Sequence, residues 1–270
     1  MMARPRNPEP VDILRGVERA AALLQRFTPD RPVVDLPQAA RLLDVPRSTA
    51  YRLLRSLEAG GFLIYDPPRQ TYRLSLAVAR LGQAALAGVD LRLVARPHLR
   101  RLVDETGESS FLLVVEGRSA VVIDTVASDA PLRLTYPVGT PWPLYAGASN
   151  KVLLAHLPEE IAAEVLSAPL PRITPRTLTD PSRLRAELSR IRRQGFAHSV
   201  GELTPGIVGV AVPILSGGQL MGALAVAGPV SRLTTARVPQ SVTSLKHAAL
   251  SIADALEGAG NHHRRRGWKG

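Results

Sequence analysis

The sequence predicts an α+β protein in two parts: a small N-terminal module of short helices with a β-hairpin, and a larger domain with an antiparallel sheet flanked by helices. Between residues 11 and 59, apolar residues recur at helical spacing in three short runs. From residue 108 onward, short β-prone runs with tight turns alternate with helical stretches. The 270 residues are enough for two domains.

The first two helices are expected over 11–27 and 35–43. Asp35 suits the N-cap of the second helix, and Pro37 suits its first turn. Only "DVP" separates the second helix from a third, at 46–59. Two short helices joined by three or four residues form a helix-turn-helix unit.

The third helix carries a positively charged face opposite an apolar stripe. Its apolar positions follow the i, i+3, i+4, i+7 pattern of a buried face: Ala50, Leu53, Leu54 and Leu57. The opposite face carries Ser48, Tyr51, Arg52 and Arg55. Pro46 suits the first turn, and Gly60 suits the left-handed residue that ends a helix. One face is therefore expected in the core and the other against a negatively charged partner.

A hairpin is expected next, because "FLIYDPPRQTYRLS" places two β-prone runs around a Pro-Pro turn with Arg69 near its tip. Three helices and such a wing predict a winged helix-turn-helix DNA-binding domain over 10–75. Base edges are assigned to Ser48, Thr49, Tyr51 and Arg52, and phosphates to Arg47, Arg55 and Arg69. The alternative is a small helical interaction module with a solvated basic face.

The remaining chain is read as a linker helix at 76–90 and a domain at 91–258, between a disordered arm at 1–9 and a disordered basic tail at 259–270. Strands are expected in "SSFLLVVEGRSAVVIDTVAS" (two), "PLRLTYPVG", "GFAHSV", "IVGVAVPIL" and "LMGALAVAG". Helices are expected at 147–157, 158–167, 181–194 and 235–257.

Composition narrows the function classes. A net charge of +11 favours a polyanionic partner, although the tail alone carries four of these charges. No apolar run is long enough for a transmembrane helix, and the first residues lack a signal-peptide pattern, so a cytoplasmic protein without a membrane partner is expected. The absence of cysteine excludes disulfides and thiolate chemistry. No motif predicts a metal site or a cofactor.

Six blocks in order resemble the isocitrate-lyase-regulator (IclR) family of bacterial transcription factors: "VPRSTAYRLLRSLEAGGFL", "ARPHLRRLVDETGESSFL", "PLYAGASNKVLLA", "ITPRTLTD", "RRQGFAHSVGELTPGIVGVAVPI" and "AVAGPVSRLT". The resemblance covers almost the whole chain. It implies a winged-helix domain, a linker helix and a GAF-like effector domain, with a dimer of dimers as the usual assembly. It also implies regulation by a small metabolite, often an organic or aromatic acid.

Transferred position by position, the resemblance implies an effector pocket lined by Leu134, Trp142, Ala148, Ser149, Ser199, Ile207, Gly209, Ala225 and Ala227. Asn150 is added as a side-chain donor, and Glu202 as an acid over the pocket because its block matches the family. The chain departs from the common family pattern at Tyr145, at Ser199-Val200 and at the two alanines. These departures argue against the small, highly polar keto acids that the family often binds.

The loop Ala146–Asn150 precedes an apolar helix, so its backbone N–H groups are expected to form an anion site with Ser149, Asn150 and Ser199 as donors. The opposite walls, Leu134, Trp142, Ile207, Ala225 and Ala227, are expected to offer no hydrogen bonds. The predicted effector is a monocarboxylate with a hydrophobic body, such as an aromatic acid or a branched amino or keto acid. The alternative is that the apolar pocket closes as core.

The function predicted is therefore a ligand-responsive transcriptional repressor, not an enzyme, that binds a pseudo-palindromic operator as a homodimer or a dimer of dimers. A regulator without a ligand is one alternative. A hydrolase that uses the C-terminal pocket is another, with Ser149 and Lys151 as the nucleophile pair. Their i, i+2 spacing points the two side chains to different faces of a helix, which disfavours it.

Overall fold

A computed structural model describes residues 14–28, 30–87 and 90–266. The predicted arm at 1–9 lies outside these residues. The chain divides into two compact units, one up to Gly88 and one from Val89 onward. No helix among the described residues is long and apolar enough to cross a membrane.

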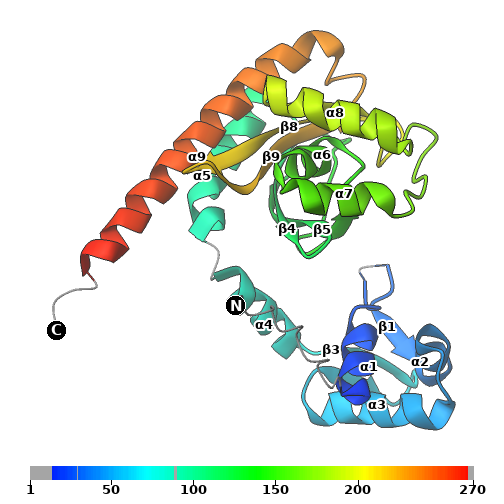
Figure 1. Ribbon diagram of the computed structural model, residues 1–270. Coiled ribbons are helices and arrows are strands. Elements are labelled where there is room, and N and C mark those ends of the chain that lie inside the picture. Colours follow the sequence, from blue (N-terminus) through cyan, green and yellow to red (C-terminus); the bar gives the residue numbers. More distant parts are fainter. Residues whose placement is uncertain (1–13, 29, 88–89, 267–270) are drawn as a thin grey trace, which may run out of the picture. The chain divides into compact units, whose positions relative to one another are not determined.

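The described part of the N-terminal unit has three short helices with a small sheet, followed by a linker helix (Figure 1). Its helices are α1 (Arg15–Leu24), α2 (Leu36–Leu43), α3 (Arg47–Ala59) and the linker helix α4 (Leu76–Ala87). Strands β2 (Leu63–Asp66) and β3 (Thr71–Leu74) form the predicted hairpin, and β1 (Val33–Asp35), which the sequence analysis missed, pairs with β3. The core of the unit includes Leu23, Ala39, Ala50, Leu54, Leu57 and Tyr72.

Both ends of α2 are formed by residues that favour helix termini. The Asp35 carboxylate accepts a hydrogen bond from the Gln38 backbone at 2.7 Å, and the Gln38 side chain accepts one from the Asp35 backbone at 3.1 Å. This capping box satisfies two N–H groups at the start of α2. Asp44 adopts the left-handed conformation, with φ of 50°. The expectation for Gly60 was wrong: it stays helical at φ −74°, and Gly61 takes the left-handed turn at φ 76°.

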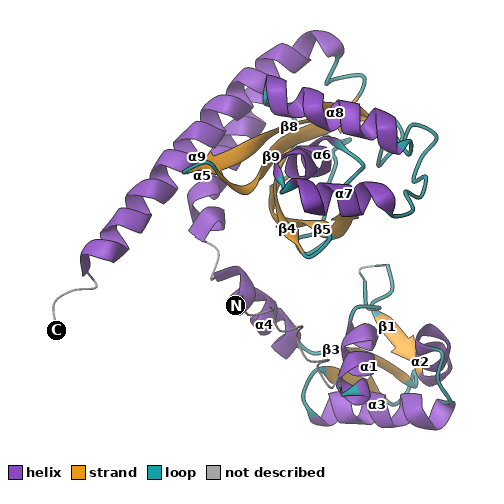
Figure 2. Cartoon of the chain, in the orientation of Figure 1, coloured by secondary structure: helices purple, strands orange, loops and turns teal. Residues whose placement is uncertain are grey.

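The C-terminal unit contains a six-stranded antiparallel sheet in the order β6-β5-β4-β9-β8-β7 (Figure 2). Its strands are β4 (Ser109–Glu116), β5 (Ser119–Val126), β6 (Pro141–Pro143), β7 (Ala197–Val200), β8 (Ile207–Ser216) and β9 (Gln219–Pro229). Its helices are α5 (Asp90–Thr106), α6 (Ala148–His156), α7 (Glu159–Ser167), α8 (Pro181–Gln194) and α9 (Val238–Arg266).

Helices cover both faces of this sheet. The long helices α5 and α9 pack side by side, with α9 against β8 (Figure 1). Helix α6 packs against β8 and β9 from the other side and carries α8, which contacts α7. The alternate alanines of β9, Ala223, Ala225 and Ala227, belong to the core cluster that includes α6. Their small side chains let the first turn of α6 approach the sheet closely.

Two sequence expectations differ from the structure in this unit. The segment "PLRLTYPVG" is not a strand, and β5 pairs instead with β6, which follows it. Pro131 and Pro137 cannot donate to a ladder, and Leu134 and Tyr136 turn their side chains into the core. The tail is also different, because α9 continues to Arg266 instead of ending at residue 257. The apolar periodicity of the sequence stops near residue 257, but a helix can continue beyond its last apolar residue.

Candidate functional site

The outer face of α3 is the candidate DNA-binding surface. Ala50, Leu54 and Leu57 are buried in the core of the N-terminal unit, as the stripe predicts, and Leu53 is half-buried. Five of the residues assigned to DNA are exposed on the opposite side: Arg47, Ser48, Tyr51, Arg52 and Arg55. Thr49 is half-buried and lines a groove between α1 and α3 together with Arg52. The arrangement offers hydroxyl, phenol and guanidinium groups from one helix.

Two arginines assigned to phosphates are in ion pairs at the surface. Arg55 lies 2.6 Å from Glu58 one turn further along α3. Arg69 lies in the turn between β2 and β3, 3.2 Å from Asp66, with 81% of its side chain exposed. Exposed pairs of this kind contribute about 0–1 kcal/mol. Either arginine can therefore exchange its partner for a phosphate at little cost.

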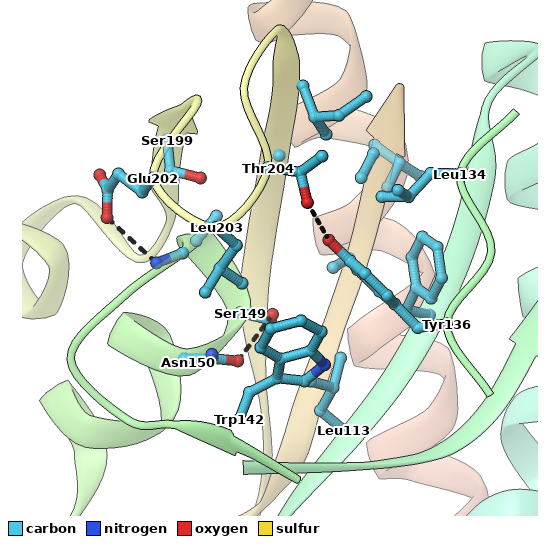
Figure 3. A pocket seen from close by; sticks show the side chains of 18 residues that line it. Leu113, Leu134, Tyr136, Trp142, Ser149, Asn150, Ser199, Glu202, Leu203 and Thr204 are labelled. Carbon is cyan, nitrogen blue, oxygen red and sulfur yellow. Dashed lines mark hydrogen bonds between the residues drawn. The ribbon is translucent and has the colours of Figure 1, made fainter. Parts of the chain in front are cut away.

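A second site is a pocket in the C-terminal unit, between the start of α6, the sheet and the loop that follows β7 (Figure 3). The enclosed cavity has a volume of about 50 Å³, and the space between the walls reaches about 520 Å³ when the opening toward solvent is included. All eleven residues assigned to the effector line it: Leu134, Trp142, Ala148, Ser149, Asn150, Ser199, Glu202, Ile207, Gly209, Ala225 and Ala227. The structure thus brings together positions from five separate stretches of the sequence.

Aromatic side chains form one wall of the pocket. The ring of Tyr136 lies 5.4 Å from that of Phe111 and 5.1 Å from that of Trp142, the latter edge to face. The Tyr136 hydroxyl is 3.3 Å from the Thr204 hydroxyl, so the aromatic wall and the loop after β7 meet over the pocket (Figure 3). Burial raises the pKa of Tyr136, which keeps its hydroxyl protonated as a donor.

The start of α6 differs from the anion site that the sequence predicts. Gly147, at φ 88°, donates its backbone N–H to Glu202 Oε2 at 3.0 Å, so a carboxylate of the chain already occupies part of the site. Leu203 packs so closely on Gly147 that a Cβ there would lie 2.7 Å from its Cδ1. Within the described part of the chain, no hydrogen bond occupies the N–H groups of Ala148, Ser149 and Asn150. Three backbone donors therefore remain.

A buried lysine neutralises Glu202. Lys151 is 2% exposed, and its Nζ lies 2.6 Å from Glu202 Oε1 and 3.8 Å from Glu187 Oε1. Glu187 also pairs with Arg190 at 2.8 Å. Although burial raises the pKa of Glu187, the hydrogen bond from Arg190 and the charges of Lys151 and Arg190 outweigh it and lower that pKa. Lys151 and Arg190 thus neutralise Glu187 and Glu202, and these four residues form a closed set of charges beside the pocket.

The polar side chains of the pocket divide into occupied and free groups. Ser149 donates a hydrogen bond to Asn150 Oδ1 at 3.2 Å (Figure 3). Asn150 donates one to the Pro143 carbonyl at 3.0 Å, so its amide joins the start of α6 to β6. Ser199 makes no hydrogen bond through its hydroxyl within the described residues. Among the described residues the Ser149 hydroxyl bonds to Asn150 and Lys151 Nζ bonds to Glu202, so no hydrogen bond joins Ser149 and Lys151 as a hydrolytic pair would need.

Several lining residues were missed by the sequence analysis: Phe111, Leu113, Tyr136, Gly147, Leu203, Thr204 and Val226. The i, i+2 alternation of Phe111 and Leu113 in β4 indicates a shared face, and could have found them. Tyr136 was assigned to a strand that does not form. Leu203 and Thr204 follow Glu202 in a loop whose path has no periodic signal.

Two family models match the chain. The model described as the IclR helix-turn-helix domain matches residues 16–67, and the one described as bacterial transcriptional regulator IclR C-terminal matches residues 83–254. The chain belongs to the IclR family. Its winged helix-turn-helix is accordingly a DNA-binding domain, and this IclR-family chain is a transcriptional regulator.

Curated IclR-family relatives match along almost their whole length. The HTH-type transcriptional regulator KipR of Bacillus subtilis is 31% identical over 241 residues, which are 88% of this chain and 96% of KipR. The HTH-type transcriptional repressor AllR of Escherichia coli is 31% identical over 257 residues, 94% of this chain and 95% of AllR. These relatives are regulators and not enzymes, which confirms the expectation of a non-enzyme.

Solved IclR structures share the fold. An IclR regulator from Alicyclobacillus acidocaldarius has a TM-score of 0.80 at 28% identity and covers 90% of this chain and 98% of its own. An IclR homologue from Microbacterium hydrocarbonoxydans, in complex with 4-hydroxybenzoate, has a TM-score of 0.78 at 32% identity and covers 90% of this chain and 99% of its own. The predicted α+β architecture is confirmed.

Proposed function

We propose that this IclR-family regulator is a repressor whose operator binding responds to a small monocarboxylate with an apolar or aromatic body. The observation that carries the ligand class is the composition of the pocket. The first turn of α6, with the three free backbone N–H groups, lines the pocket together with aromatic and aliphatic side chains. Amides at a helix N-terminus bind anions, and the walls gain about 25 cal/mol for each Å² of apolar surface that they bury.

The charges beside the pocket restrict how such an acid binds. Because Glu202 is the only charged side chain among the described lining residues, an acid that enters meets no free cation. Its carboxylate is therefore held by the amides of Ala148, Ser149 and Asn150 and by the Ser199 hydroxyl. A second carboxylate would stand unpaired against apolar walls at a cost of several kcal/mol, which favours monoacids. The 4-hydroxybenzoate bound by the Microbacterium homologue has this composition.

The DNA side of the proposal is a homodimer on a pseudo-palindromic operator. Two recognition helices in successive major grooves stand about 34 Å apart. AllR is named as a repressor and supports the same sign of regulation here. DNase footprinting upstream of the genes that adjoin this one tests the proposal, and the expected result is a protected inverted repeat. The absence of any protected repeat would contradict it.

Calorimetry on the full chain tests the ligand class. Benzoate, branched keto acids, glyoxylate and pyruvate are titrated separately, and the first two groups are expected to bind more tightly. Ser199→Ala and Trp142→Ala should weaken the binding of the tightest acid, because they remove the free hydroxyl and the aromatic wall. Ser189→Ala, at a half-buried serine of α8 that does not line the pocket, is the control and should leave that affinity unchanged. Tight binding of glyoxylate or pyruvate without any response to the other acids would overturn the proposed class.

A further inference from the structure

The aromatic wall of the pocket contains one hydrogen-bond donor without a partner. The sequence analysis expected Trp142 to offer only apolar surface. In the structure its indole Nε1 is shielded from solvent and has no acceptor among the described residues. Trp142 also lines the pocket. Buried indole N–H groups usually have a hydrogen-bond partner, so this one marks a position where an acceptor is missing.

The backbone around Trp142 fixes where this donor points. Trp142 pairs with Ala120 in the ladder between β5 and β6, and its neighbour Pro143 accepts the hydrogen bond from Asn150. The edge-to-face contact with Tyr136 holds the ring itself. In Figure 3 the indole nitrogen lies on the side of the ring toward Leu113 and away from Asn150. The donor is therefore held away from the first turn of α6, where the carboxylate is placed by the proposed function.

The groups around the indole do not supply an acceptor. Phe111 and Leu113 are hydrocarbon, and the Tyr136 hydroxyl is engaged with Thr204 at 3.3 Å. The other free polar groups of the pocket, the amides of α6 and the Ser199 hydroxyl, belong to the carboxylate end. The pocket thus has donors at two places with hydrocarbon between them.

We propose that the effector carries, besides its carboxylate, a hydrogen-bond acceptor on its body that bonds to Trp142 Nε1–H. This inference rests on the proposed function and makes it narrower. The ligand class becomes an oxygen-substituted aromatic or apolar monocarboxylate, such as a hydroxy- or methoxy-substituted aromatic acid. Trp142 then determines specificity, because a ligand with a plain hydrocarbon body leaves the indole donor unpaired in the complex.

Matched pairs of acids test the inference by calorimetry on the full chain. The 2-, 3- and 4-hydroxybenzoates are each compared with the methylbenzoate of the same substitution pattern, which has nearly the same shape but no acceptor. At one ring position the wild type should prefer the hydroxy acid by about threefold to tenfold, the value of one hydrogen bond. In Trp142→Phe this ratio should fall to about one, even though both acids lose affinity from the smaller ring.

The second tryptophan provides the control. Trp268→Phe makes the same chemical change at a position outside the described residues, and it should keep the preference of the wild type. It also leaves Trp142 as the sole tryptophan, so the indole N–H resonance of that variant reports on Trp142 alone. The preferred hydroxy acid should shift this resonance downfield, and its methyl partner should not.

The possible failures are distinguishable. If the acids bind but no hydroxy acid is preferred, or if the preference survives in Trp142→Phe, the role of Trp142 is wrong and the proposed class stands. An unshifted indole resonance in the complex with a preferred hydroxy acid also contradicts the proposed role of Trp142. If no acid in the panel binds the wild type, the proposed carboxylate class is wrong as well.

Discussion

At the scale of single residues, the buried Lys151 decides how the pocket holds its shape. Its ion pair with Glu202 ties α6 to the loop after β7, and the same carboxylate takes the N–H of Gly147. Thr174 and Thr177 donate hydrogen bonds to the carbonyls of that loop from its other side, at 2.6 Å to Gly201 and 2.8 Å to Glu202. The loop that brings Leu203 and Thr204 to the pocket is therefore fixed from both sides.

Lys151→Met should lower the free energy of unfolding by about 3–5 kcal/mol, because it leaves the Glu202 carboxylate buried without its cation. Urea denaturation of the full chain measures this. Adding Glu202→Gln should restore part of the loss, since the remaining group is then neutral. Lys246→Met, at an exposed lysine of α9 that donates a hydrogen bond to the Gln194 carbonyl, is the control and should change stability by only about 1 kcal/mol. A Lys151→Met variant as stable as this control would contradict the role of the pair.

The two kinds of arginine on the DNA-binding domain should behave differently. Arg52→Ala should relax base preference at one position of each half-site if Arg52 reaches a base edge, as we propose. Arg69→Ala, in the wing, should weaken binding to all sequences alike and reduce the salt dependence by about one ion if Arg69 binds phosphate, as we propose. Binding titrations on operator and random duplexes at several salt concentrations separate the two. Identical effects of both variants on specificity would refute the assignment.

The sequence predicts which residues line the pocket better than it predicts which groups those residues bond to. All eleven proposed pocket residues line the pocket, because ordered family blocks fix which positions meet. The partners of Glu202 and the unpaired indole of Trp142 could not be predicted. They depend on distances between segments about 50 residues apart, which no local pattern encodes. The start of α6 lines the pocket, but Glu202 takes one of its N–H groups, and an anion site there stays a prediction.

At the scale of elements, the capping box at the start of α2 has a measurable role, since it satisfies two N–H groups of the helix that precedes the recognition helix. Asp35→Ala removes the side-chain acceptor of the capping box and should destabilise the N-terminal unit by about 1 kcal/mol. Asp35→Asn is the matched control, because asparagine caps as well as aspartate does. Thermal unfolding of the full chain compares the two. Equal losses for Ala and Asn would mean that charge, and not the cap, is responsible.

Elements with strong periodicity or clear end signals could be predicted, and the others could not. The recognition helix, the hairpin and the closing helix begin within a few residues of expectation, because apolar spacing and prolines mark them. The segment "PLRLTYPVG" alternates like a strand, yet it supplies Leu134 and Tyr136 to the pocket without a ladder. Strand β1 is three residues long, too short for any period to show. Whether such a short segment forms a strand depends on its pairing with a strand far away in the sequence.

At the scale of the whole molecule, unpaired apolar side chains on the N-terminal unit favour a dimer. Leu14 and Val17 are 71% and 65% exposed at α1, and Leu76 and Leu81 are 81% and 55% exposed on α4. We expect light scattering to give a dimer or larger species at micromolar concentration. Val17→Glu with Leu81→Glu should shift it toward monomer, whereas Ile173→Glu, at a half-exposed loop position of the other unit, should not. A wild-type monomer would rule this out.

The closed set of charges beside the pocket has a consequence for how the regulator behaves when the ionic background changes. Lys151, Arg190, Glu187 and Glu202 neutralise one another, so an acid in the pocket is held by dipoles and apolar contact. The winged helix holds DNA through arginines that displace counterions. A rise in salt concentration would therefore weaken operator binding directly, while the affinity of the pocket for its acid would change much less. The same metabolite signal would then act on a repressor whose hold on DNA varies with salt.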